Sequence, residues 1–169
     1  HAELFENTRL DNLTYAHPSE MGTFTAAFTS LSQGKLEGRD ALGQPTDGYE
    51  SSDSAFSFGF ARQTDPADLG AAMKYIRSHI GSAEAQTIGF DLGAKRELGA
   101  FAFGAAVRNI GPGLKYDDRR NDLPLRLAAG AAYKLVGSHA LAFELTNGPR
   151  GTGTDAAFGN ELHMDPCAR

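Results

Sequence analysis

The sequence has little of several things that would point to common protein classes. Its 169 residues include one cysteine, Cys167, and no tryptophan. A single thiol excludes an internal disulfide framework. Positive charge is not in excess, because 16 Lys and Arg face 21 Asp and Glu, for a net charge of −5. A nucleic-acid-binding protein usually carries a basic face, so we expect no nucleic-acid partner.

Long hydrophobic runs and catalytic motifs are also missing. The longest charge-free apolar run, Leu98–Val107, is far shorter than the ~20 residues that a transmembrane helix needs. The sequence has no Gly-x-Ser-x-Gly elbow, phosphate-binding loop, His-Glu-x-x-His motif or paired cysteines. We therefore expect neither an enzyme nor a bound cofactor.

What the sequence has instead is glycine, phenylalanine and an alternating pattern. It contains 20 Gly, 11 Phe and 5 Tyr. Apolar residues alternate with small or charged ones over many segments, which indicates β-strands. The longest predicted strands are Ser54–Arg62, Leu69–Ile80, Glu84–Arg96, Ala100–Ile110 and Leu123–Leu135. Shorter predicted strands are Asn12–Ala16, Thr23–Ser32, Leu141–Leu145 and Ala156–His163.

The length of these segments points to a membrane. Strands of about ten residues exceed the usual five or six and match the ~9–11 that a tilted strand needs to cross hydrocarbon. The predicted fold is an all-β, antiparallel, up-and-down transmembrane β-barrel, with residues 1–169 forming a single domain. A soluble sandwich shows the same alternation, so a soluble ligand-binding β-protein remains an alternative.

The connections between these strands are alternately long and short. We expect Gln33–Ser52, Gly81–Ala83, Gly111–Asp122 and Asn147–Asp155 to lie outside the cell, although Gly81–Ala83 is itself short. We expect Gln63–Asp68, Glu97–Gly99 and Val136–Ser138 to face the periplasm. Outer-membrane barrels have this pattern of longer external loops and short periplasmic turns.

One segment has a helical alternative. The stretch Asp65–Arg77 could begin as a helix, with Asp65 as the N-cap and Pro66 as the first helical residue. We favour a strand, because the same stretch alternates cleanly and has strands on both sides.

Five short segments, in order along the chain, resemble one protein family. They are Leu69–Arg77, Phe90–Ala94, Gly104–Pro112, Leu123–Tyr133 and Phe158–Glu161. Together they resemble the PorV/PorQ family of outer-membrane β-barrels, which is related to the FadL-type transport barrels. The resemblance implies a Gram-negative outer-membrane barrel of about fourteen strands.

The resemblance also implies a role and partners. Members of the PorV type serve the type IX secretion system in protein transport, where they bind C-terminal signal domains of secreted proteins and pass them to a sortase-like surface protein. Family members are about twice as long as this chain, so we expect its eight or nine visible strands to lack the N-terminal and C-terminal strands of the barrel. A FadL-like channel for small solutes is the alternative function.

Charged residues on the less apolar faces are the candidates for the barrel interior, because Arg or Lys on the lipid face costs ~2–4 kcal/mol at mid-membrane. They form either a polar path that orients a ligand or a network of paired charges that fills the barrel, and we favour the network. The candidates are Lys74, Asp91, Lys95, Arg108, Arg126, Lys134 and Glu144, with Glu161 as a further one.

Two other groups of residues have weaker functional interpretations. An external loop offers candidate contacts for a partner or for Ca²⁺, at Lys115, Tyr116, Asp117, Asp118, Arg119 and Arg120, although a solvated loop is the simpler interpretation. His163, Asp165 and Cys167 alternate near the end of the chain, but without a second cluster we predict no metal site there.

Overall fold

A computed structural model describes residues 2–3, 8–39, 42–117, 119–135, 139–148 and 153–162. These ranges consist mainly of β-strands and contain no helix, so no helix in them is long and apolar enough to cross a membrane. The strands are β1 (Ala2–Glu3), β2 (Thr8–Ser19), β3 (Gly22–Arg39), β4 (Pro45–Arg62), β5 (Asp68–Ile80), β6 (Ala83–Leu98), β7 (Phe101–Ile110), β8 (Leu114–Tyr116), β9 (Arg119–Asn121), β10 (Arg126–Lys134), β11 (His139–Gly148) and β12 (Gly153–Leu162).

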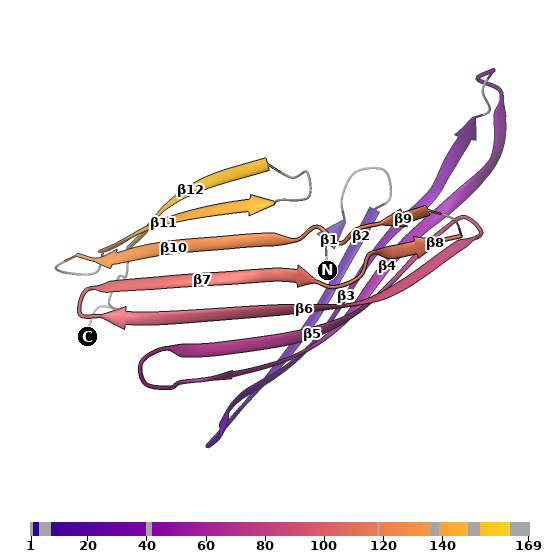
Figure 1. The fold of residues 1–169 in the computed structure, drawn as a ribbon. Helices are drawn as coiled ribbons and strands as arrows, with labels where there is room; N and C mark the ends of the chain where they lie inside the picture. Colours follow the sequence, from indigo (N-terminus) through magenta and orange to yellow (C-terminus); the bar gives the residue numbers. More distant parts are fainter. Residues whose placement is uncertain are drawn as a thin grey trace, which may run out of the picture. The chain divides into compact units, whose positions relative to one another are not determined.

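Ten of these strands form one antiparallel sheet, and neighbours in the chain are neighbours in the sheet (Figure 1). The order runs from β1 to β7 and then through β10, β11 and β12. β8 and β9 form a separate two-stranded hairpin within the connection from β7 to β10. This up-and-down order is the one expected from the sequence, and it is an open series among the described strands.

The chain divides into two compact units. The first contains His1–Phe60, Ala72–Phe90 and Gly111–Leu123. The second contains Ala61–Ala71, Asp91–Ile110 and Pro124–Arg169.

All nine predicted strands are present, but several boundaries were wrong. The segment Gln33–Ser52, predicted as a long polar connection, is mostly strand, because β3 continues to Arg39 and β4 begins at Pro45. Polar residues there obscured the alternation, because both strands continue through segments that lack a regular apolar row. With the short β1 and the β8–β9 hairpin, the described strands also outnumber the eight or nine predicted.

The helical alternative for Asp65–Arg77 is wrong, because Asp68–Ile80 is β5. Residues along β5 are exposed and partly covered in alternation, as a strand requires. The strand predicted over Leu123–Leu135 begins only at Arg126, and Leu123 lies in the connection before it.

A hydrophobic core is almost absent from the described residues. Ala85 and Leu123, with 3% and 4% of their surface exposed, are the buried apolar residues, and no large side chain is fully buried. Phe90, Leu92 and Phe103 are instead 46%, 53% and 46% exposed. A soluble domain of this length normally buries most of its large apolar side chains. The apolar surface of these strands is therefore uncovered.

Candidate functional site

The candidate site is a pair of opposite sheet faces with different chemistry, and the register of the second unit defines them. Residues directly opposite in paired strands lie on the same face. Tyr133 of β10 is opposite both Phe101 of β7 and Leu141 of β11, and Phe143 of β11 is opposite Phe158 of β12. The apolar face of this unit comprises Phe101, Phe103, Ala105, Val107, Leu127, Ala129, Ala131, Tyr133, Leu141, Phe143, Leu145, Ala156 and Phe158.

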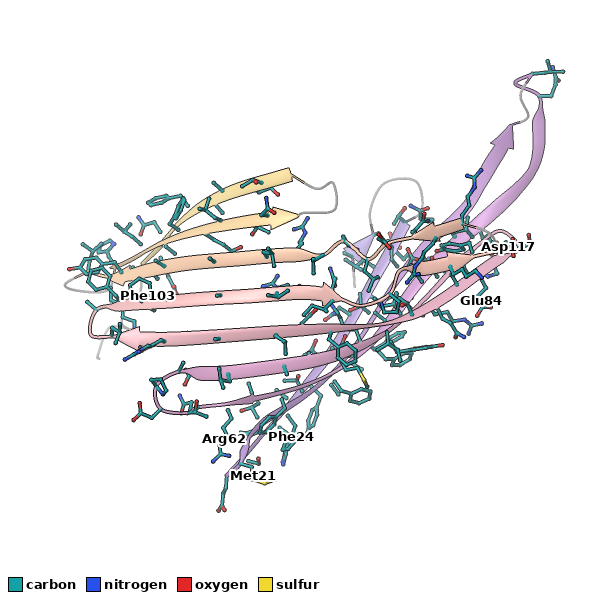
Figure 2. All side chains as sticks on the ribbon, viewed as in Figure 1. Met21, Phe24, Arg62, Glu84, Phe103 and Asp117 are labelled. Atoms are coloured by element: carbon teal, nitrogen blue, oxygen red, sulfur yellow. The ribbon has the colours of Figure 1, made fainter. Side chains whose placement is uncertain are left out.

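Aromatic rings gather at one end of this apolar face. The ring centroids of Phe101 and Tyr133, on neighbouring strands, are 4.7 Å apart, and those of Phe101 and Phe103 are 6.2 Å apart. Figure 2 shows Phe103 on β7 within this group of side chains. Such ring pairs stabilise a fold by more than the apolar area they bury. All three residues nevertheless keep more than a third of their surface exposed.

The first unit has an apolar face of the same kind. Phe24 of β3 lies 4.8 Å from Phe60 of β4 between ring centroids, and Phe28 lies 4.6 Å from Phe56. The register of β2 continues the row, because Leu13 is opposite Phe28. The other face of β2 and β3 is more polar, since Asn12 donates a 2.7 Å hydrogen bond to Thr29 there, although Leu10 lies opposite Leu31 on the same face.

Polar pairs border the apolar residues at the turn between β5 and β6. Tyr75 donates a hydrogen bond to Gln86, and Arg77 donates two to Glu84, at 2.6 and 2.9 Å. The guanidinium of Arg77 holds the pKa of the exposed Glu84 carboxyl below its usual value through this hydrogen bond. The apolar face thus ends at Tyr75, and the ion pair lies beyond it beside the turn.

The apolar stretch has the same length on four strands. It covers Leu69–Tyr75 on β5, Ile88–Ala94 on β6, Phe101–Val107 on β7 and Leu127–Tyr133 on β10, which is seven residues each. At ~3.3 Å per residue this is about 20 Å along the strand, close to the ~25 Å apolar band of outer-membrane barrels.

The opposite face, the small-residue face, has mostly alanine and glycine. In the second unit it pairs Ala102 with Ala132, Gly104 with Gly130, and Ala106 with Ala128. A row of residues this small leaves open space above the backbone. Between β10, β11 and β12 the same face continues through Ala128, Gly130, Ala132, Ala140, Ala142, Glu144, Thr146, Ala157 and Gly159.

Six of the seven charged candidates for the interior, all except Lys74, lie on this small-residue face in the second unit, which includes β6 because a Cβ atom at Gly93 would contact Cβ of Ala106. Lys74 belongs to the first unit, where its side chain lies beside Gly89 of β6. Lys74 and Asp91 are half-buried, and the other five, Lys95, Arg108, Arg126, Lys134 and Glu144, are exposed. The further candidate Glu161 is opposite Ala140 on the same face. The alternation of each strand places them there, as the sequence predicted, but their role stays a prediction.

The structure links some of these charges and separates others. Glu97, which the sequence did not single out, joins Lys95 at 2.7 Å and Lys134 at 3.5 Å between charged atoms. Glu144 accepts a 3.1 Å hydrogen bond from Thr146. Arg108 and Arg126 are directly opposite each other in the register of β7 and β10. Two of the candidate charges thus pair with Glu97, whereas two like charges meet at Arg108 and Arg126, and the network of paired charges stays a prediction.

The loop candidates are part of a β-hairpin. Lys115 is opposite Arg120 and Tyr116 is opposite Arg119 in the pairing of β8 with β9, and Asp117 lies in the turn between them (Figure 2). Asp118 lies outside the described residues, as do His163, Asp165 and Cys167. Within the described part of the chain, no three His, Cys, Asp or Glu residues are grouped to hold a metal ion.

The connection that carries this hairpin packs against β6, which the sequence analysis missed. Thr87 donates a 2.7 Å hydrogen bond to the carbonyl of Pro112, and a Cβ atom at Gly89 would lie 3.3 Å from Cδ1 of Leu123. Leu123 thus fills the space that Gly89 leaves on the small-residue face of β6. The sequence does show Gly89 on the face opposite the apolar residues of β6, which indicates space there. Nothing in the sequence indicates that Leu123 fills that space.

Comparison with known proteins adds no relative. Protein-family models, curated proteins and solved structures were each searched, and none of them matches this chain. The resemblance to the PorV/PorQ family thus rests on the five sequence segments alone.

Proposed function

We propose that this chain contributes strands to a β-barrel in a bacterial outer membrane, with the apolar face toward lipid and the small-residue face toward the interior. The observation that supports this proposal most strongly is the exposure of the large apolar side chains, while small and charged residues occupy the opposite face. In a soluble protein the arrangement would be the reverse. In a membrane, outward apolar residues contact acyl chains, and alternating inward residues contact water.

Within that barrel, we propose a non-enzymatic docking role in protein export, as an accessory of the type IX secretion system. The five segments that resemble PorV/PorQ proteins support this role. Its partners would be the C-terminal signal domains of secreted proteins and a sortase-like surface protein. The β8–β9 hairpin offers exposed charged residues for such a contact, with Lys115 opposite Arg120 on one face and Arg119 opposite Tyr116 on the other.

Cell fractionation tests the membrane location. The protein, expressed in a Gram-negative host, is expected in the outer-membrane fraction, resistant to high salt and carbonate and released only by detergent. Release by a salt wash alone would contradict the membrane proposal and favour the soluble ligand-binding alternative.

Partner capture tests the docking role separately. The affinity-tagged protein, purified in mild detergent, is expected to retain secreted proteins that bear their C-terminal domain and to lose them when that domain is deleted. Normal secretion after removal of the gene would contradict the role and leave the membrane location intact.

A solute channel is the second candidate function, and the lining of the small-residue face favours it. Alanine and glycine leave room along that face, and charged groups stand at both ends of it in the second unit. Conductance in planar bilayers distinguishes the two functions, since a docking barrel with a closed interior is expected to pass no current.

A further inference from the structure

Two arginines face each other on the small-residue face without a carboxylate between them. Arg108 of β7 and Arg126 of β10 are directly opposite in the antiparallel register. Cβ atoms of such a pair lie about 4.5–5.5 Å apart, and like charges at that separation repel. In the described part of the chain neither guanidinium has an ion pair or hydrogen bond, and both side chains are exposed.

Asp91, a carboxylate on the neighbouring strand β6, is already engaged. Oδ1 of Asp91 accepts a 2.8 Å hydrogen bond from the backbone N–H of Asn109. The neighbouring residues on the face, Ala106 and Ala128, are too small to cover the two guanidinium groups. The arginine pair is therefore accessible from the interior side.

The backbone beside the pair is held in an uncommon conformation. Asn109 follows Arg108 and has a positive φ of 61°, which residues other than glycine rarely adopt. Its side-chain Nδ2 donates a 2.9 Å hydrogen bond to the carbonyl of Pro124, two residues before Arg126. Asn109 thus ties together the segments that carry both arginines. Residues held in such conformations concentrate at functional sites.

We propose that Arg108 and Arg126 form a binding site for a phosphate-type oxyanion. Each guanidinium presents a planar fork of N–H donors, and two opposed forks match the several acceptor oxygens of one tetrahedral dianion. A bound dianion also removes the repulsion between the two cations. The inference rests on the proposed function for its interior location, and it makes phosphate-type anions the solute class that this interior recognises.

Inorganic phosphate is the probe for the test. The full chain in detergent micelles is titrated with phosphate at constant ionic strength, and binding is measured as heat and as a rise in the unfolding temperature. The double variant R108Q/R126Q is expected to lose binding. R108K/R126K, which keeps the charge but not the forks, is expected to bind about tenfold more weakly. The matched control K95Q/K134Q removes two charges from the same face and is expected to bind as the wild type does.

Asn109 acts as a positioning residue, and rescue by glycine tests it. Asn109→Ala is expected to weaken phosphate binding, whereas Asn109→Gly is expected to restore most of it because glycine adopts a positive φ freely. Two equally weak variants would contradict the positioning role.

Several results would overturn the site. They are equal phosphate binding by wild type and R108Q/R126Q, equal loss in the K95Q/K134Q control, or stabilisation of the wild type by chloride as strong as by phosphate. Membrane extraction, measured on the same variants, separates this inference from the proposed function. A wild-type protein that inserts into the membrane but binds no phosphate contradicts the inference alone, and a soluble protein contradicts the membrane proposal whatever it binds.

Discussion

At the scale of single residues, glycines allow close approach between strands and connections. Gly111 follows β7, and a Cβ atom there would clash with the backbone carbonyl of Ile88 on β6. Gly93, by contrast, leaves 3.7 Å from its Cβ position to the carbonyl of Ala105, which is ordinary contact. The two positions therefore differ in their need for glycine, although the sequence does not distinguish them.

Alanine substitution tests that difference. Gly111→Ala is expected to destabilise the folded protein by about 1–3 kcal/mol, because the Ile88 carbonyl belongs to a paired strand and cannot move freely. Gly93→Ala, the matched control, is expected to be neutral or stabilising by up to ~1 kcal/mol. Urea unfolding in detergent measures both, and equal effects would show that the close approach at Gly111 is not required.

The arginine pair gives a second expectation at this scale. Without an anion, Arg126→Gln is expected to raise the free energy of unfolding by about 0.2–1 kcal/mol, because it removes the like charge opposite Arg108. Lys134→Gln is the control, and it is expected to lower the free energy of unfolding because Lys134 forms an ion pair with the carboxylate of Glu97. Urea unfolding in phosphate-free buffer at low salt measures the free energy of unfolding of both variants. Destabilisation by Arg126→Gln would contradict a repulsion between the two arginines.

At the scale of elements, alternation within each strand was the part that sequence reasoning predicted well. Phe101, Phe103 and Val107 fall on one face of β7, as their spacing required. A strand has only two faces, so the hydrophobic pattern alone fixes which side each residue takes. The ends of the strands were predicted less well. β3 continues to Arg39 through polar residues, and hydrogen bonds between backbones produce no alternation of side chains that the sequence would show.

Neighbouring residues of β7 test the assignment of faces. Phe103→Arg is expected to destabilise the membrane-inserted protein by about 2–4 kcal/mol, because it places a charge in hydrocarbon. Ala102→Arg, one position away on the small-residue face, is expected to cost much less. Folding into lipid vesicles, followed by urea titration, gives both values. A larger cost at Ala102 would mean that the faces are reversed.

At the scale of the whole molecule, the chain forms strands throughout its described parts but buries almost no apolar side chains. Of the two buried apolar residues, Leu123 belongs to the packing of the β7–β10 connection on β6, and Ala85 is a residue of β6 itself. This packing escaped sequence analysis because it joins residues far apart in the chain. Likewise, the facing of Arg108 and Arg126 depends on the register between strands, which composition and periodicity leave open.

Tryptophan fluorescence tests the central claim most directly, because the native sequence contains no tryptophan and a single substitution supplies the whole signal. Phe143 and Ala142 are neighbours on β11, with Phe143 on the apolar face and Ala142 on the small-residue face. In vesicles of lipids with brominated acyl chains, we predict strong quenching of Phe143→Trp and little quenching of Ala142→Trp. Equal quenching of the two, or none for Phe143→Trp, would contradict a lipid-facing apolar surface.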